Sequence, residues 1–257
     1  MNISGVEDMS QASASDHIKL AIAGPPGSGK SWLAVSGASE TEPVFCYDFD
    51  GRKQSIAGKK NVFVKTYQDV NYPNMMPMAW TNFLSDIQAM EVAKAKNDLQ
   101  YKWLVPDSMT YMCQAAMNYL LYNDRGIRRE IKSGLVTTYV PKSFDAYKAE
   151  QAEINGALSR LFCLGNVVCT FHTAPEKAPE HTAEAPKFTG KLTVDPPRAI
   201  DLLALFNEQW LIKALGPDSY EVQTKPDYFF LAKTALKINA TEKPNLRDII
   251  AKHRATP

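Results

Sequence analysis

The residues best suited to chemistry lie in one glycine-rich segment, Gly24-Pro25-Pro26-Gly27-Ser28-Gly29-Lys30-Ser31. Its spacing fits G-x-x-x-x-G-K-[ST], in which glycines let backbone N–H groups approach a phosphate closely. The lysine of such a segment reaches the β- and γ-phosphates of ATP, and the following hydroxyl binds Mg²⁺. The segment therefore predicts ATP and Mg²⁺ as ligands, with Lys30 acting in catalysis and Ser31 on the metal. The expected nucleotide contacts are Gly24, Pro25, Pro26, Gly27, Ser28, Gly29, Lys30, Ser31 and Trp32.

The flanking sequence supports this interpretation over a glycine-rich turn that carries a solvated lysine. An apolar run, Ile18 to Ala23, precedes the loop and indicates a short buried strand. Ser31 to Val35 follows the loop and is compatible with a helix. A strand, the loop and a helix in this order are the context that a phosphate-binding loop requires.

Two further strand ends carry acidic residues. The strand predicted at Pro43–Tyr47 is followed by Asp48 and Asp50, and the one at Tyr101–Val105 leads to Asp107. Asp107 stands where ATPases with this loop keep the aspartate that orients Mg²⁺, although it would also serve as the N-cap of the next helix. Pro106 has no N–H to donate, so we expect the strand to lose full pairing or to bulge there.

His172 ends another apolar strand, Val167–Phe171. A histidine at the carboxyl end of such a strand is able to sense whether a γ-phosphate is present. A structural histidine with satisfied hydrogen bonds is an equal alternative.

The segment from Asp124 to Lys148 differs from the rest in charge. It holds six basic and three acidic residues, a net charge of +3 in a chain whose total is +1, so the remainder carries −2. Its tyrosines 139 and 147 are able to stack on bases. We expect an irregular, mobile basic excursion at about 124–145 that contacts a polyanion, and a solvated helix face is the alternative. The expected contacts are Arg125, Arg128, Arg129 and Lys132.

Strands and helices alternate as far as His172, and strands then follow strands. This order predicts an α/β fold with a mainly parallel central sheet, flanking helices and a C-terminal antiparallel β extension. A neutral, proline-rich loop is expected at about 173–197. The other expected elements are strands at 61–67, 208–214, 220–224 and 228–234 and helices at 80–95, 109–122, 146–164, 199–205 and 245–254.

Composition bounds the remaining possibilities. With 257 residues and 45% hydrophobic content, the chain is long enough for one large domain, expected at 17–257 after a mobile polar leader at 1–16. Four cysteines without a C-x-x-C pair and four scattered histidines support neither a disulfide framework nor a zinc site, and a reducing cytoplasm fits. No apolar run reaches membrane-spanning length, so no membrane association is expected.

The ordered set of Gly24–Ser31, Asp48-Phe49-Asp50, Asp107-Ser108, Phe171-His172 and Ala232-Lys233 resembles a RecA-type P-loop ATPase core. Within that superfamily it is most similar to the small single-strand-annealing ATPases of phages. The resemblance covers roughly residues 17 to 240, and only the phosphate-binding loop is a specific motif. It implies that Asp50 polarises the attacking water, that Asp107 binds Mg²⁺, that His172 is the sensor and that Lys233 reaches a neighbouring subunit's nucleotide.

The same resemblance implies an ATPase that binds single-stranded DNA and supports annealing or strand exchange in phage-type recombination. It also implies a homo-oligomer, ring or filament, with the nucleotide between subunits, in the cytoplasm of a bacterial host if the protein is phage-encoded. Asp50 is one methylene shorter than the family's usual glutamate, so slow hydrolysis is expected. Two alternatives stay open: a P-loop phosphotransferase with an Arg125–Arg129 lid, and a nucleotide-gated binding protein whose hydrolysis is vestigial.

Overall fold

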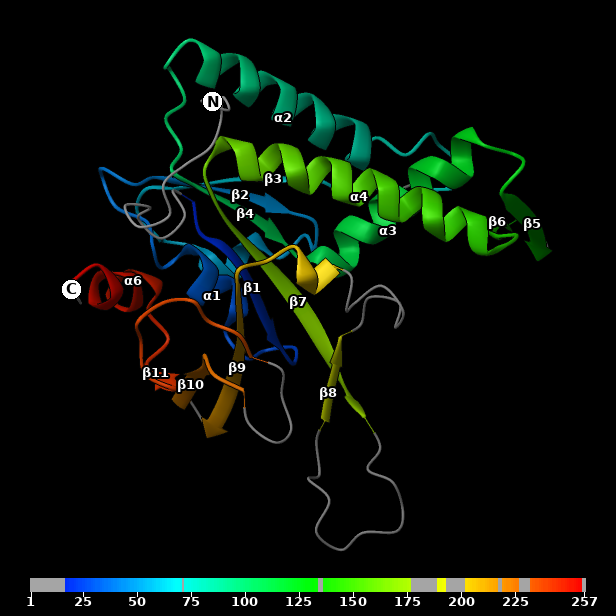
Figure 1. Ribbon diagram of the computed structural model, residues 1–257. Coiled ribbons are helices and arrows are strands. Elements are labelled where there is room, and N and C mark those ends of the chain that lie inside the picture. Colours follow the sequence, from blue (N-terminus) through cyan, green and yellow to red (C-terminus); the bar gives the residue numbers. More distant parts are fainter. Residues whose placement is uncertain are drawn as a thin grey trace, which may run out of the picture.

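The computed structural model describes residues 17–70, 72–133, 136–176, 189–192, 202–216, 219–226 and 232–255. The strands are β1 (Lys19–Gly24), β2 (Val44–Asp48), β3 (Val62–Thr66), β4 (Trp103–Asp107), β5 (Arg128–Ser133), β6 (Val136–Pro141), β7 (Asn166–Glu176), β8 (Thr189–Leu192), β9 (Glu208–Gly216), β10 (Ser219–Gln223) and β11 (Thr241–Glu242). The helices are α1 (Lys30–Val35), α2 (Ala79–Ala95), α3 (Met109–Asn123), α4 (Phe144–Leu164) and α6 (Leu246–Ala255), with a 3-10 turn η1 (Lys53–Ile56) (Figure 1).

One large sheet organises the fold. Its strand order is β11-β10-β9-β1-β7-β4-β2-β3, and β8 pairs with the extension of β7. The six strands from β9 to β3 are parallel, whereas β10, β11 and β8 are antiparallel to their partners. The α/β fold with a mainly parallel sheet is thereby confirmed.

Both faces of the central strands β1, β4 and β2 are largely buried, which explains why these strands read as apolar runs. Along β1, Ala21 packs toward α2, α3 and α4, whereas Leu20 and Ile22 pack toward α1 and α6. Along β4, Leu104 and Trp103 divide between the two faces in the same way. Figure 1 shows the long helices α2 and α4 over one face and α1 with α6 over the other.

The C-terminal strands differ in one respect from the expectation. The sequence predicts an antiparallel meander beginning at residue 208, but β9 runs parallel to β1, with Leu20 opposite Glu208 and Ala23 opposite Leu211. The antiparallel extension therefore begins with β10. Of the strand expected at 228–234, residues 228–231 lie outside the described residues, and Lys233 forms an isolated bridge with Gln209. The leader at 1–16 also lies outside them.

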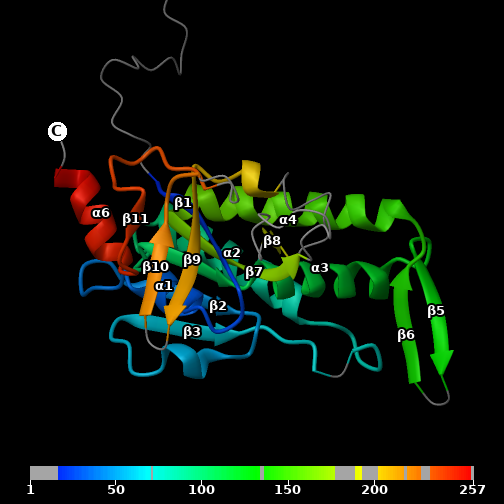
Figure 2. The ribbon, with the colours of Figure 1, turned by 90° about the horizontal axis from the view of Figure 1, so that it is seen from below.

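Two segments expected to be irregular contain regular strands. Strand β7 continues to Glu176 and pairs with β8, so the loop expected at 173–197 begins and ends within a β-hairpin; its residues 177–188 and 193–197 lie outside the described ones. The basic excursion forms the antiparallel hairpin β5–β6, with Arg129 opposite Val140. This hairpin lies beyond the far ends of α3 and α4, away from the large sheet (Figure 2). Cross-strand pairing supplies the backbone hydrogen bonds that an irregular loop would leave to water.

Pro106 bears out the expected loss of pairing. It stays in register with Tyr47 of β2, but the ladder between β4 and β7 pairs only Trp103 and Leu104. The ladder with β7 therefore does not continue through Val105 and Pro106, although the Thr170 side chain of β7 still donates to Asp107.

The start of β9 contains a fully buried carboxylate, Glu208. It accepts hydrogen bonds from Trp210 Nε1 at 3.1 Å and from the backbone N–H of Ala235 at 2.8 Å, and a third from the Thr234 hydroxyl. These bonds fasten the segment that carries Lys233 to the sheet.

We expect Glu208→Ala to lower the free energy of unfolding by about 3 kcal/mol, because it leaves buried donors without acceptors. Urea denaturation followed by circular dichroism measures this loss. The matched control is Glu40→Ala, at an exposed carboxylate, which should change stability by less than about 0.5 kcal/mol. Equal stabilities of the two variants would contradict this role for Glu208.

Candidate functional site: a phosphate-binding loop at the carboxyl edge of the sheet

The glycine-rich segment forms the turn between β1 and α1, as the sequence predicts. Gly27 and Gly29 have φ angles of 77° and 84°, in the left-handed region that side chains disfavour. A Cβ atom on Gly24 would lie 2.7 Å from both Ile212 Cγ2 and Ser28 Oγ, so only glycine fits there. Three of the motif's glycines are thus required by the backbone path.

Two polar groups inside the loop have the geometry expected of an anion site. Lys30 Nζ turns back into the loop and donates to the Pro25 carbonyl at 2.8 Å. Burial lowers the pKa of Lys30 to about 8, although Asp107 and Asp50 act in the opposite direction. The Ser28 hydroxyl is buried with no hydrogen-bond partner among the described residues. A phosphate in this loop would give both groups an acceptor.

Asp107 lies at the end of β4, beside the loop. Its carboxylate accepts hydrogen bonds from the Thr170 hydroxyl of β7 and from the Ser31 hydroxyl of α1. Burial is the main reason that its pKa is raised; these two hydrogen bonds oppose the shift, and the nearby carboxylates of Asp50 and Asp48 add to it. Asp107 is therefore a buried carboxyl group whose ionised form its two hydrogen bonds only partly stabilise.

Asp50, Ser108 and His172 form a second hydrogen-bonded group at the same edge. Asp50 Oδ1 accepts from the Ser108 hydroxyl at 2.6 Å and from its backbone N–H at 3.2 Å, and Oδ2 lies 2.9 Å from His172 Nε2. Burial raises the pKa of Asp50, but the hydrogen bonds from His172 and Ser108 outweigh it and hold the pKa below its ordinary value. Asp50 is therefore an ionised carboxylate held between two partners.

Asp48, the other acid after β2, has a local structural role. It accepts from the backbone N–H groups of Arg52 at 3.0 Å and Lys53 at 3.2 Å, and from the Thr66 hydroxyl. Its carboxylate thereby caps the turn η1. Of the two neighbouring acids, Asp50 is the one that joins the group at the candidate site.

The structure places Trp32 and Lys233 at the margin of this arrangement. Trp32 is 48% exposed, and Lys59 Nζ lies 3.1 Å from the centroid of its ring. Lys233 is exposed, and its backbone pairs with Gln209, which is level with Ala21 rather than with Gly24. Lys233 therefore does not belong to the group formed by Lys30, Asp50, Asp107 and His172.

The basic residues expected to contact a polyanion divide into two kinds. Arg125, Arg129 and Lys132 are exposed. The Arg128 side chain is only 8% exposed; it donates to the Leu121 and Tyr122 carbonyls at the end of α3 and stacks on Tyr139. Arg128 therefore caps the end of α3, where helix carbonyls lack partners, and little of its side chain is left exposed for the expected contact with a polyanion.

Two positioning residues escaped the sequence analysis. Ser108 was noted only as the neighbour of Asp107, and Thr170 only as part of an apolar strand. Ser108 directly follows the end of β4 and Thr170 lies in the middle of β7, so both are single polar residues that give only a weak signal in the sequence. Their roles depend on contacts with Asp50 and Asp107, 58 and 63 residues away in the chain.

A family model described as an AAA domain matches residues 16–233, most of the chain. The protein belongs to this AAA-domain family. It is therefore a nucleotide-binding P-loop ATPase, as the loop and its surroundings indicate. A search of the curated proteins finds none that matches this chain. No helix in the described ranges is long and apolar enough to cross a membrane.

The chemistry of these residues suits ATP and a divalent cation. The Ser31 hydroxyl and the Asp107 carboxylate are both hard oxygen donors, and Mg²⁺ binds through one or two carboxylates together with substrate phosphates and water. Burial is the main cause of the raised pKa of Asp107 and the nearby carboxylates of Asp50 and Asp48 add to it, and a bound cation would favour the ionised form of Asp107. Lys30 is placed to meet the negative charge of the phosphates.

The lowered pKa of Lys30 predicts that ATP affinity falls as the pH rises above about 8. Bound phosphates favour protonated Lys30, so binding takes up a proton wherever the free protein has lost it. Affinity should approach a tenfold loss per pH unit above that value, while the ATP phosphates stay fully ionised. Titration calorimetry between pH 7.5 and 9.5 checks this, and the dependence of the heat on buffer ionisation reports the proton uptake.

The matched variant is Lys30→Arg, because arginine keeps its charge throughout this range. Its affinity should not change with pH, whatever its absolute value. If parent and variant lose affinity in parallel, a group other than Lys30 is responsible.

Proposed function

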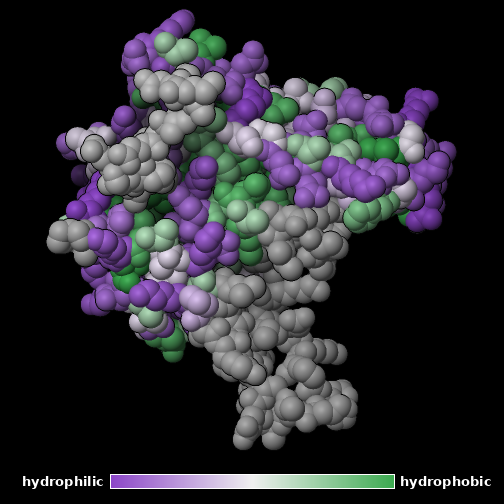
Figure 3. Space-filling model, viewed as in Figure 1, coloured by the Kyte–Doolittle hydropathy of each residue, from purple (hydrophilic) through white to green (hydrophobic). Residues whose placement is uncertain are grey.

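We propose that this AAA-domain ATPase is a RecA-like, Mg²⁺-dependent protein that binds single-stranded DNA and supports annealing or strand exchange in phage-type recombination. The observation that carries the DNA assignment is the β5–β6 hairpin. It extends beyond α3 and α4 and exposes Arg129 and Lys132, and Arg125 is exposed in the turn that leads into it. Figure 3 shows mostly hydrophilic side chains at this outer end of the molecule.

The hairpin is suited to the backbone of a nucleic acid. Alternation along β5 places Arg129 on one face and Lys132 on the other, so both faces present a cation. Ile131 is 44% exposed on the same strand, next to these cations. Exposed cations combined with apolar or aromatic surface are typical of sites that bind single strands without reading their sequence.

For ATP hydrolysis, each group at the sheet edge has a distinct role in our proposal. Lys30 binds the β- and γ-phosphates, and Asp107 and Ser31 hold the Mg²⁺ that neutralises charge on them. Asp50 is the residue we assign to the attacking water, and Ser108 and His172 hold its carboxylate in place. His172 would respond to the γ-phosphate through the bond it shares with Asp50. Slow hydrolysis of ATP is consistent with this arrangement, because both carboxylate oxygens of Asp50 already have hydrogen-bond partners.

The phosphotransferase alternative loses support from the position of the arginines. Arg125 lies beyond the end of α3, and α3 begins directly after Ser108. Its 15 residues place the hairpin about 22 Å from the phosphate-binding edge, at 1.5 Å per residue. A lid that closes over ATP in the same subunit would have to span this distance.

A homo-oligomer with nucleotide between subunits is also part of the proposal. Lys233 is exposed and lies away from the chain's own phosphate-binding loop. Glu208 nevertheless holds its segment through Thr234 and Ala235, so its backbone is firmly placed. A cation in this situation is suited to the nucleotide of a neighbouring subunit.

We expect Asp50→Asn and Asp107→Asn to differ in their effects. Asp50→Asn should lower the turnover of ATP at least 100-fold and leave ATP affinity within about twofold, because it removes a charge assigned to the water. Asp107→Asn should also abolish the Mg²⁺ dependence of binding, because it removes a metal ligand. Phosphate release and nucleotide titrations with and without Mg²⁺ measure both. Parental turnover in Asp50→Asn would place the catalytic acid elsewhere.

The DNA assignment is tested by the salt dependence of binding. Each neutralised phosphate contributes about −0.7 to the slope of log affinity against log salt for single strands. Arg129→Ala combined with Lys132→Ala should therefore flatten the slope by roughly 1 to 1.5 units, with similar weakening across sequences. Fluorescence anisotropy of a labelled oligonucleotide with ATP present gives the slopes.

The matched control replaces two exposed lysines remote from the hairpin, Lys60→Ala with Lys96→Ala. This control should keep the parental slope. If both double variants lost the same amount of salt slope, the effect would come from the overall charge of the protein and not from the hairpin. No oligonucleotide binding by the parent would remove the DNA assignment, and ATP turnover without DNA stimulation would then favour a nucleotide-gated binding protein.

A further inference from the structure

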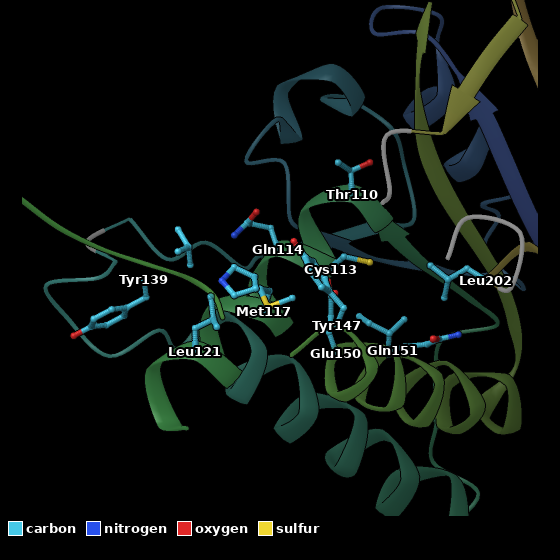
Figure 4. A pocket seen from close by; sticks show the side chains of 13 residues that line it. Thr110, Cys113, Gln114, Met117, Leu121, Tyr139, Tyr147, Glu150, Gln151 and Leu202 are labelled. Atoms are coloured by element: carbon cyan, nitrogen blue, oxygen red, sulfur yellow. The ribbon is translucent and has the colours of Figure 1, made fainter. Parts of the chain in front are cut away.

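A cavity of about 390 Å³ lies between α3 and α4, at the root of the β5–β6 hairpin. Figure 4 shows side chains of α3, among them Gln114 and Met117, along one wall, and side chains of α4, among them Glu150 and Gln151, across from them. Tyr139 of the hairpin lies at one end. Its size falls within the range of pockets that hold small ligands, about 300–1,000 Å³.

The lining combines apolar surface with a few hydrogen-bonding groups. Met117, Leu121 and Ile154 supply apolar side chains, and Tyr139 and Tyr147 supply aromatic ones. The amides of Gln114 and Gln151 and the carboxylate of Glu150 add polar groups to the lining, and Gln114 Nε2 donates to Asn118 Oδ1 at 2.8 Å. A flat apolar ring with polar edge groups matches such a lining better than an aliphatic chain does.

Charge restricts the ligand further. The described lining residues include Glu150 but neither lysine nor arginine, so a phosphate inside the cavity would be repelled. The cations lie on the adjoining hairpin, where Arg129 and Lys132 are exposed. A lining without cations inside and exposed cations outside correspond to the two parts of a nucleotide in a single strand, its base and its phosphate.

The hairpin and the cavity are also physically continuous. Tyr139 lines the cavity, and Arg128 stacks on its ring at 3.9 Å while holding the last turn of α3. Tyr139, Tyr147 and Ile127 pack on Met117, Leu121 and Ala146 in one small apolar cluster. A single strand of nucleic acid bound along the hairpin would thus pass close to the cavity.

We propose that this cavity binds one unstacked nucleobase of a single strand whose phosphates contact the hairpin. The inference rests on the proposed DNA binding and adds to it a contact that depends on a base rather than on charge. Insertion of a base removes apolar surface from water and replaces hydrogen bonds to water by bonds to side-chain amides. Single-stranded nucleic acid is suited to such binding because its bases are free to leave the stack.

The test fills the cavity without changing its charge. Met117→Trp puts a larger apolar side chain into the cavity, and the matched control is Met76→Trp, at a 45% exposed position outside the cavity lining. Two oligonucleotides of equal length and charge are compared by anisotropy, one with bases and one with an abasic backbone. Because a buried, stacked base contributes about fivefold or more to affinity, the parent should prefer the first.

Met117→Trp should reduce that preference by at least fivefold and leave the salt slope unchanged, whereas Met76→Trp should behave as the parent. A single 2-aminopurine in the oligonucleotide should change its fluorescence on binding to parent but not to Met117→Trp. Circular dichroism and ATP affinity show whether both variants are folded.

Three outcomes would overturn the inference. An unchanged base preference in folded Met117→Trp would show that the cavity is not used. An equal loss for both oligonucleotides would show a general effect of the substitution. Binding of a free nucleoside that Met117→Trp abolishes, with the preference between oligonucleotides unaffected, would assign the cavity to a small metabolite. If the folded parent binds neither oligonucleotide at any salt concentration, the proposed DNA function is wrong, and the inference that rests on it is wrong as well.

Discussion

The buried carboxylate of Asp107 is the constraint on which the rest of the site depends. It has 7% of its surface exposed and is held by Thr170 from β7 and Ser31 from α1. A charge in this position is costly unless its partners keep their geometry. Strand β7 must therefore lie between β1 and β4, and α1 must begin directly after the glycines. The register Gly24 opposite His172 follows from the same arrangement and brings the histidine to Asp50.

The sequence predicted the fold and the loop because their signals are local. Apolar runs bounded by glycine, proline or acids mark the central strands, and the spacing Gly24–Ser31 is specific in itself. The partners of Asp50 could not be predicted in the same way. Ser108 and His172 are 58 and 122 residues away from it, and only the strand order brings them together. The course of the backbone after β2 decides which of Asp48 and Asp50 caps a turn. The residue types in this segment do not predict that course.

For the basic segment, the sequence shows the charges but does not predict which contacts each charged side chain makes. Arg128 and Arg129 are neighbours in sequence and differ completely in surroundings, because strand alternation turns Arg128 onto Tyr139 and the end of α3. A count of charges gives both the same weight. Tyr139, expected to stack on bases, has Arg128 stacked on its ring and also lines the cavity. Pairing between β5 and β6, absent from any local pattern of apolar residues, decides these roles.

The length of α3 has a mechanical consequence. Helix α3 starts at the residue after Ser108, which is bonded to Asp50, and ends at the carbonyls that Arg128 holds. One end of this helix, here called its pivot, therefore lies beside Asp50, and the other end, its tip, lies at the hairpin. A rotation of about 5° at the pivot moves a tip about 22 Å away by roughly 2 Å, given a rise of 1.5 Å per residue. A small rotation of α3 about its end at the phosphate-binding edge would thus become, at the hairpin, a displacement of the order of an atomic contact distance.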